Sequence, residues 1–171
     1  MEPFRSLALL TGSLGLIFCL TALSTDFWFV AEGPNTSAHS GLWPNGHGDP
    51  VAGYIHVTQS FSILAALWAL VSVSFLVLSC IPSLSAPGQG PLISTITAFA
   101  AVLSMVVAMA VYTSERWDQP RNPQIQTFFS WSFYLGWVST IFLLCTGDSP
   151  AHCPGELGRA QLGALRTEGR G

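Results

Sequence analysis

Apolar side chains dominate four stretches of this chain, and a long interval without any charge links two of them. No Asp, Glu, Lys or Arg occurs from residue 50 to residue 114. A soluble domain is about one-quarter charged, so such an interval is not expected in one. A helix needs about 20 apolar residues to cross the hydrocarbon core of a bilayer. The pattern predicts four membrane-spanning helices, at residues 7–23, 57–81, 92–112 and 127–146.

Polar segments separate the four stretches and predict two loops on one side of the membrane. The first, residues 24–56, contains aromatic pieces among its Gly, Pro and charged residues. Flexible linkers lack aromatics, so this loop is expected to be ordered. The second loop is predicted at residues 113–126. The domain organisation is then a membrane domain of residues 1–147 and a cytosolic tail of residues 148–171, whose composition predicts disorder.

Small residues recur at helical spacing on one face of the first and third predicted spans. The two series are Ala8, Gly12, Gly15, Cys19 and Ala22, and Ser94, Ala98, Ala101 and Ala108, the second with the larger Met105 inserted. Small side chains let membrane helices approach closely, so Gly12, Gly15, Ala98 and Ala101 are predicted helix-packing positions. The first span also resembles a cleaved signal peptide, since Ala22-Leu23-Ser24 has a small-x-small pattern. A discarded peptide needs no packing face, which favours a retained helix.

Charge and motifs exclude several classes of function. Charged residues make up 9% of the chain, the net charge is −3 and lysine is absent, so a nucleic-acid partner is not expected. Transporters and channels usually carry ionisable groups within the membrane, and the predicted spans contain no Asp, Glu, Lys or Arg. No catalytic or phosphate-binding motif occurs, so neither an enzyme nor a cofactor is predicted. The spacing of His39, His47 and His56 fits no regular metal motif.

Orientation follows from the arginines and from a sequon. Four spans put both termini on one side, and four of the six arginines lie on that side. The positive-inside bias therefore favours cytosolic termini. Asn35-Thr36-Ser37 is a candidate N-glycosylation site in the first loop, with an unused sequon as the alternative.

The four cysteines predict no luminal disulfide, because none lies in a predicted luminal loop. Cys80 and Cys145 fall at the cytosolic ends of their spans, where reversible palmitoylation occurs. Unmodified interfacial thiols are the alternative at both positions.

One motif in the first loop carries a resemblance. Trp28 followed by Gly41-Leu42-Trp43, in a four-span protein, resembles the peripheral myelin protein, epithelial membrane protein and claudin superfamily. The resemblance implies an all-α membrane fold, a left-handed four-helix bundle with a small antiparallel sheet formed by the first extracellular loop. The candidate strands are Phe27–Val30, Gly41–Trp43 and Tyr54–Val57, with Trp43 anchoring the sheet at the membrane surface or simply resting in the interface.

The resemblance to claudins themselves is incomplete. In claudins two cysteines follow the motif, whereas Pro44, Asn45 and Gly46 stand here where the first would be. The loop therefore lacks the claudin disulfide. This departure argues against a rigid paracellular barrier and favours the wider superfamily.

Longer strings resemble the branch of this superfamily that occurs in cytotoxic lymphocytes. They are RSLALL at residues 5–10, LSTDFWF at 23–29, GYIHVTQ at 53–59 and YTSERWDQP at 112–120. The resemblance implies a protein of the cytolytic granule membrane and cell membrane that supports granule exocytosis and target-cell killing. Its partners would be membrane lipids and other membrane proteins, with a homo-oligomer also open. A claudin-like adhesion or junction protein is the alternative function, and a channel or transporter is a weaker one.

Overall fold

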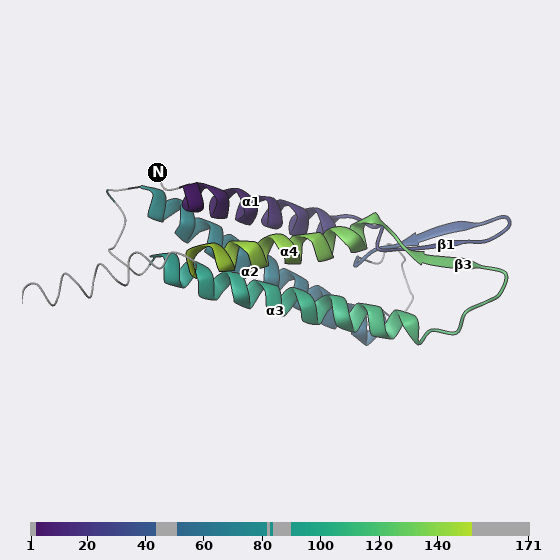
Figure 1. Cartoon of the computed structure of the whole chain (residues 1–171). Helices are drawn as coiled ribbons and strands as arrows, with labels where there is room; N and C mark the ends of the chain where they lie inside the picture. Colours follow the sequence, from purple (N-terminus) through teal and green to yellow (C-terminus); the bar gives the residue numbers. More distant parts are fainter. Residues whose placement is uncertain (1–2, 44–50, 82, 84–89, 152–171) are drawn as a thin grey trace, which may run out of the picture.

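Four helices run side by side and a small sheet lies beyond one end of them in the computed structural model of this protein (Figure 1). The structure describes residues 3–43, 51–81, 83 and 90–151. The helices are α1 (Pro3–Ser24), α2 (Gly53–Cys80), α3 (Gly90–Trp117) and α4 (Trp131–Ala151). The strands are β1 (Phe29–Glu32), β2 (Ser37–Ser40) and β3 (Gln126–Phe129). The start of α1 and the end of α4 lie at the end of the bundle away from the sheet (Figure 1).

Three of these helices are long and apolar enough to cross a membrane by length and composition. Their apolar portions are Arg5–Ser24, Gly53–Cys80 and Leu92–Trp117. At about 1.5 Å per residue, the 28 residues of α2 extend about 42 Å, beyond the hydrocarbon core of about 30 Å. The fourth helix, α4, is not among the three, and its last turns include Asp148. It nevertheless packs along α1 and α3 as part of the same bundle.

Regular structure extends further into the second loop than the hydropathy pattern predicted. Helix α3 continues to Trp117 instead of ending at residue 112. The predicted start of the fourth span at residue 127 is wrong, because residues 126–129 form β3 and α4 begins at Trp131. The aromatic residues at that position fit a strand as well as a membrane helix. Residues 148–151 belong to α4, and the rest of the predicted disordered tail lies outside the described residues.

The sheet is antiparallel with the strand order β2-β1-β3, so it joins both loops. Phe29 in the central strand pairs with Ser40 of β2 and with Phe129 of β3. The sequence predicted a sheet built by the first loop alone. This prediction is wrong for β3, which comes from the second loop. The predicted strands Gly41–Trp43 and Tyr54–Val57 are also wrong, since the first follows the end of β2 and the second is the first turn of α2.

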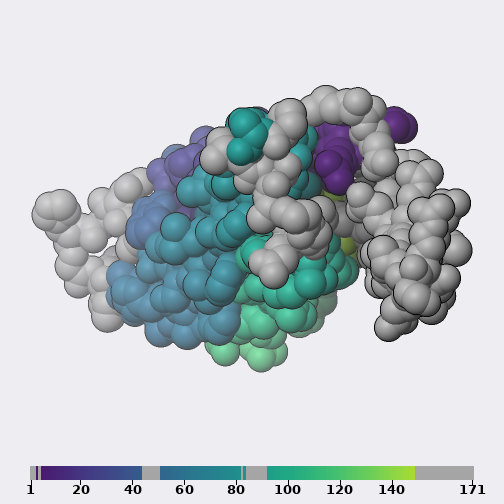
Figure 2. All heavy atoms as spheres, turned by 90° about the vertical axis from the view of Figure 1, so that its left-hand side faces the viewer, coloured from purple at the N-terminus to yellow at the C-terminus, as the bar shows by residue number. Residues whose placement is uncertain are grey.

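Small side chains and hydroxyl groups make up much of the interior of the bundle, beside larger buried residues such as Met105, Met109 and Leu143. Lipid tails are as apolar as leucine, so membrane helices associate through close packing and hydrogen bonds. On α2 the buried face consists of Thr58, Ser62, Ala65, Ala69, Ser72 and Leu76. The Ser72 hydroxyl donates to the Ser94 carbonyl of α3 at 2.9 Å. Seen from the end opposite the sheet, α2 and α3 form one continuous surface (Figure 2).

Candidate functional site

Both tryptophans of the loop motif donate hydrogen bonds to the end of α1. The last carbonyls of a helix have no partner within the helix and need an outside donor. Trp28 Nε1 donates to the Ala22 carbonyl at 2.6 Å, and Trp43 Nε1 donates to the Leu23 carbonyl at 2.8 Å. The two indoles therefore cap consecutive carbonyls of α1. This requirement for an N–H donor is a physical reason for tryptophan at both positions.

The two tryptophans differ in their surroundings. Trp28 is fully buried, and its ring meets the ring of Tyr112 edge-on at 5.1 Å and that of Phe133 at 6.3 Å. Edge-to-face pairs at such separations add to the stability gained from burial. Trp43 keeps 43% of its surface exposed. Trp28 is thus part of the core beneath the sheet, whereas Trp43 lies at its border.

Gly41 and Leu42 of the motif allow the loop to pass close to α1 and α2. A Cβ atom at Gly41 would lie 2.5 Å from Asp26 Cα, a separation that a real side chain does not tolerate. Leu42 is fully buried, and its carbonyl accepts a hydrogen bond from Gln59 Nε2 of α2. Glycine at position 41 is therefore required by the approach of two backbone segments.

Arg116 links the end of α3 to the sheet, and the sequence pattern had not singled it out. Its guanidinium carbon lies 4.4 Å above the centre of the Phe29 ring, and its Nη2 donates to Ser40 Oγ at 3.3 Å. The rings of Tyr54 and Tyr112 are 5.9 and 5.6 Å away. A guanidinium over aromatic faces is attractive, more so where water is excluded. The available signal was an arginine directly after an apolar span, but its three aromatic partners come from three elements, β1, α2 and α3.

Known proteins resemble this chain over nearly its whole length. The profile of the PMP-22/EMP/MP20/Claudin family matches residues 5–148. The chain belongs to the PMP-22/EMP/MP20/Claudin family. It is 78% identical to Protein NKG7 of Homo sapiens over 157 residues, which cover 91% of this chain and 95% of that protein. For Protein NKG7 of Mus musculus the identity is 69% over 155 residues, covering 90% and 94%. Claudin domain-containing protein 2 of Mus musculus is 28% identical over 144 residues, covering 81% and 79%.

This member of the PMP-22/EMP/MP20/Claudin family fastens its first loop without cysteines, since the sequence from residue 24 to residue 56 contains none. The structure shows what holds the described part of that loop. Trp28 and Trp43 bind α1, the Leu42 carbonyl binds α2, and Ser40 binds α3 through Arg116. The loop is therefore tied to three helices by noncovalent contacts.

The four predicted helix-packing positions of this family member lie inside the bundle. A Cβ atom at Gly15 would lie 3.1 Å from Leu143 Cγ of α4, and one at Gly12 would lie 3.2 Å from Thr146 Cγ2. Gly15 thus faces α4, and Gly12 lies between Thr146 of α4 and Val73 of α2. On α3, Ala98 and Ala101 are fully buried.

The candidate modification sites lie at opposite ends of the molecule. Asn35 is exposed in the turn between β1 and β2, at the end of the hairpin that extends away from the bundle (Figure 1). Cys80 is the last residue of α2, at the other end, and is partly exposed. Cys145 is exposed on α4. Glycosylation at Asn35 and palmitoylation at the two cysteines stay predictions.

Two of the three histidines considered for metal binding can be placed. His39 of β2 stacks on the Phe27 ring with centroids 4.8 Å apart. His56 lies in the first turn of α2, where its Nδ1 is 3.2 Å from Gln59 Oε1. His47 lies outside the described residues. Within the part of the chain that the structure describes, no three metal-ligating side chains cluster.

Proposed function

We propose that this protein is a non-enzymatic membrane protein of cytotoxic lymphocytes that supports granule exocytosis and target-cell killing. It acts in the cytolytic granule membrane and the cell membrane, with both termini in the cytosol. Its contribution is made through lateral contacts with other membrane proteins. The observation that carries this proposal is the resemblance of the strings at residues 5–10, 23–29, 53–59 and 112–120 to the granule branch of the family.

Two structural features favour contacts with neighbouring proteins over chemistry or transport. The expected spans contain no acidic or basic residue, whereas ionisable groups within the membrane usually mark ion and substrate paths. Hydrogen bonds from Trp28, Trp43 and Arg116 tie the sheet to the bundle, which favours one orientation of its surface. A fixed surface loses less entropy when a partner binds.

The proposal is tested by deleting the protein from cytotoxic lymphocytes and measuring granule release against target cells. Release should fall while conjugate formation with the targets is unchanged, and the full chain should restore it. A second rescue with Gly41→Ala, which disrupts the loop, should fail, while Gly53→Ala should succeed because a Cβ atom there meets nothing within 4 Å. Normal granule release in the deleted cells would contradict the proposal.

Adhesion is the second candidate function, and exposed apolar side chains around the sheet favour it. Trp117, Phe128 and Phe27 are 65%, 45% and 41% exposed. Exposed apolar groups of this kind are common at protein interfaces. Expression in non-adherent cells separates the two candidates, because an adhesion protein should make those cells cluster and a granule protein should not.

A further inference from the structure

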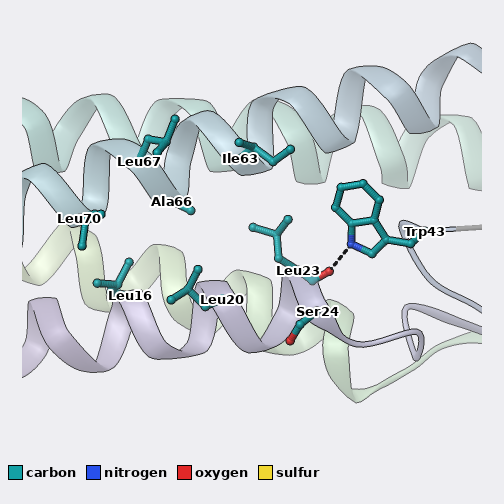
Figure 3. A pocket seen from close by; sticks show the side chains of 9 residues that line it. All are labelled: Leu16, Leu20, Leu23, Ser24, Trp43, Ile63, Ala66, Leu67 and Leu70. Carbon is teal, nitrogen blue, oxygen red and sulfur yellow. Dashed lines mark hydrogen bonds between the residues drawn. The ribbon is translucent and has the colours of Figure 1, made fainter.

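An apolar groove opens between α1 and α2 on the side of the bundle nearest the sheet. It has a volume of about 400 Å³. Leu16 and Leu20 of α1 line it on one side, and Ile63 and Leu67 of α2 line it on the other (Figure 3). Ala66 lies between the two rows. We call this cavity the α1–α2 groove.

The polarity of the groove changes along its length. Its sheet end carries the indole of Trp43, whose ring stands over the groove while its nitrogen donates to the Leu23 carbonyl (Figure 3). Ser24 lies at the same end. Below that level the lining side chains are apolar. Tryptophan favours the headgroup level of a bilayer, so the groove begins at the interface and descends into the hydrocarbon core.

The length of the groove fits one leaflet. Its lining on α1 extends from Ser24 to Leu16, which at 1.5 Å per residue is about 12 Å. Half of a hydrocarbon core is about 15 Å. Leu20, Leu67 and Leu70 are 51–55% exposed, so the groove is open to its surroundings. An occupant must therefore be apolar, slender and confined to the leaflet on the sheet side.

We propose that the α1–α2 groove binds one acyl chain of a phospholipid from that leaflet, with the chain held beneath the indole of Trp43. Lipid binding at this place goes beyond the proposed role in exocytosis and does not depend on it. A helix from a second copy is the competing occupant, and the cross-linking experiment below separates the two.

Photolabelling in a bilayer tests the proposal. The full chain is reconstituted in phosphatidylcholine vesicles that contain phosphatidylcholine with a photoactivatable group in the middle of one acyl chain. Labelled residues are then mapped by mass spectrometry. Labelling of Leu20, Ile63 and Leu67 should exceed labelling of Leu103 and Ile96 several-fold, although those two α3 side chains are more exposed, at 67% and 59%. Equal labelling of both sets would overturn the proposal.

A pair of matched variants sharpens the result. Ala66→Phe places a ring in the groove and should remove most of the preferential labelling. Ala110→Phe adds the same ring at an exposed position of α3 and should leave it unchanged. If Ala66→Phe does not fold, the labelling pattern of the unmodified chain still decides the question.

Two further outcomes would also overturn the proposal by assigning the groove to another occupant. The first is loss of the preferential labelling on adding cholesterol at a small fraction of the phospholipid. The second is efficient disulfide dimerisation through Leu67→Cys in a chain whose four native cysteines are replaced, which would place a second copy there.

Discussion

The two sides of α1 are built differently, and each has a tryptophan at its sheet end. The side toward α4 carries glycines and hydroxyls: Ser139 Oγ donates to the Gly15 carbonyl at 2.8 Å, and the Thr11 and Thr146 hydroxyls are 3.0 Å apart. Buried Trp28 caps the end of α1 and contacts Phe133 of α4. The side toward α2 carries leucines and leaves the α1–α2 groove, below half-exposed Trp43.

This difference shows how one helix can serve structure and binding at once. Small side chains bring backbones close enough for hydroxyl groups to reach carbonyls across the interface. Larger side chains line the α1–α2 groove, and these two helices make less contact with each other than α1 makes with α4. Stability is therefore expected to depend on the closed side, and ligand binding on the open side.

The largest effect is expected for Trp28→Ala on the closed side. The change removes a fully buried ring and the cap on the Ala22 carbonyl. A loss of about 3–5 kcal/mol in the free energy of unfolding is typical for such a truncation. Unfolding in detergent and surface expression both measure it. The control is Trp117→Ala, whose ring is 65% exposed and which should change little.

Gly41→Ala should be the next most damaging change, because its new Cβ atom would meet Asp26 Cα at 2.5 Å. Backbone atoms yield less than side chains, so a cost of about 1–3 kcal/mol or more is expected. The thermal midpoint in detergent is the measurement. Gly53→Ala is the matched control, and equal midpoints for both variants would refute the close approach.

Gly15→Val tests the closed side within the membrane. Its side chain would press on Leu143, whose Cγ already lies 3.1 Å from the Cβ position. Overpacking of this kind costs about 1–3 kcal/mol. Leu20→Val on the open side should cost far less, because lipid replaces the lost contacts. Equal losses in stability would remove the distinction between the two sides of α1.

Trp43→Phe should have the smallest effect on stability. The ring is kept and the hydrogen bond to the Leu23 carbonyl is lost, which costs about 0.5–1.5 kcal/mol. The same variant should weaken acyl-chain labelling of the groove, since the smaller phenyl ring is not held by a hydrogen bond to the Leu23 carbonyl. A stability loss as large as that of Trp28→Ala would show that both tryptophans belong to the core.

The periodic features of the sequence predicted the bundle well. The claudin-like fold is confirmed. It could be predicted because apolar length and small-residue faces are local properties that a helix repeats every turn. The strands failed because pairing depends on partners distant in sequence. Phe128 and Phe129 read as the start of a span, but they pair with Val30 and Phe29. The groove could not be predicted from the sequence either, since leucines on α1 and α2 do not indicate how far apart those helices lie.

Lipid exposure along α1 tests the two-sided account most directly. Nitroxide labels are placed one at a time at Leu20 and Phe18 in a chain whose cysteines are replaced, and their collisions with oxygen in a bilayer are measured. Leu20 is 51% exposed at the groove, whereas the Phe18 ring lies 5.5 Å from that of Phe142 in α4. We expect frequent collisions of oxygen with the label at Leu20 and few with the label at Phe18. Equal or reversed accessibility would contradict it.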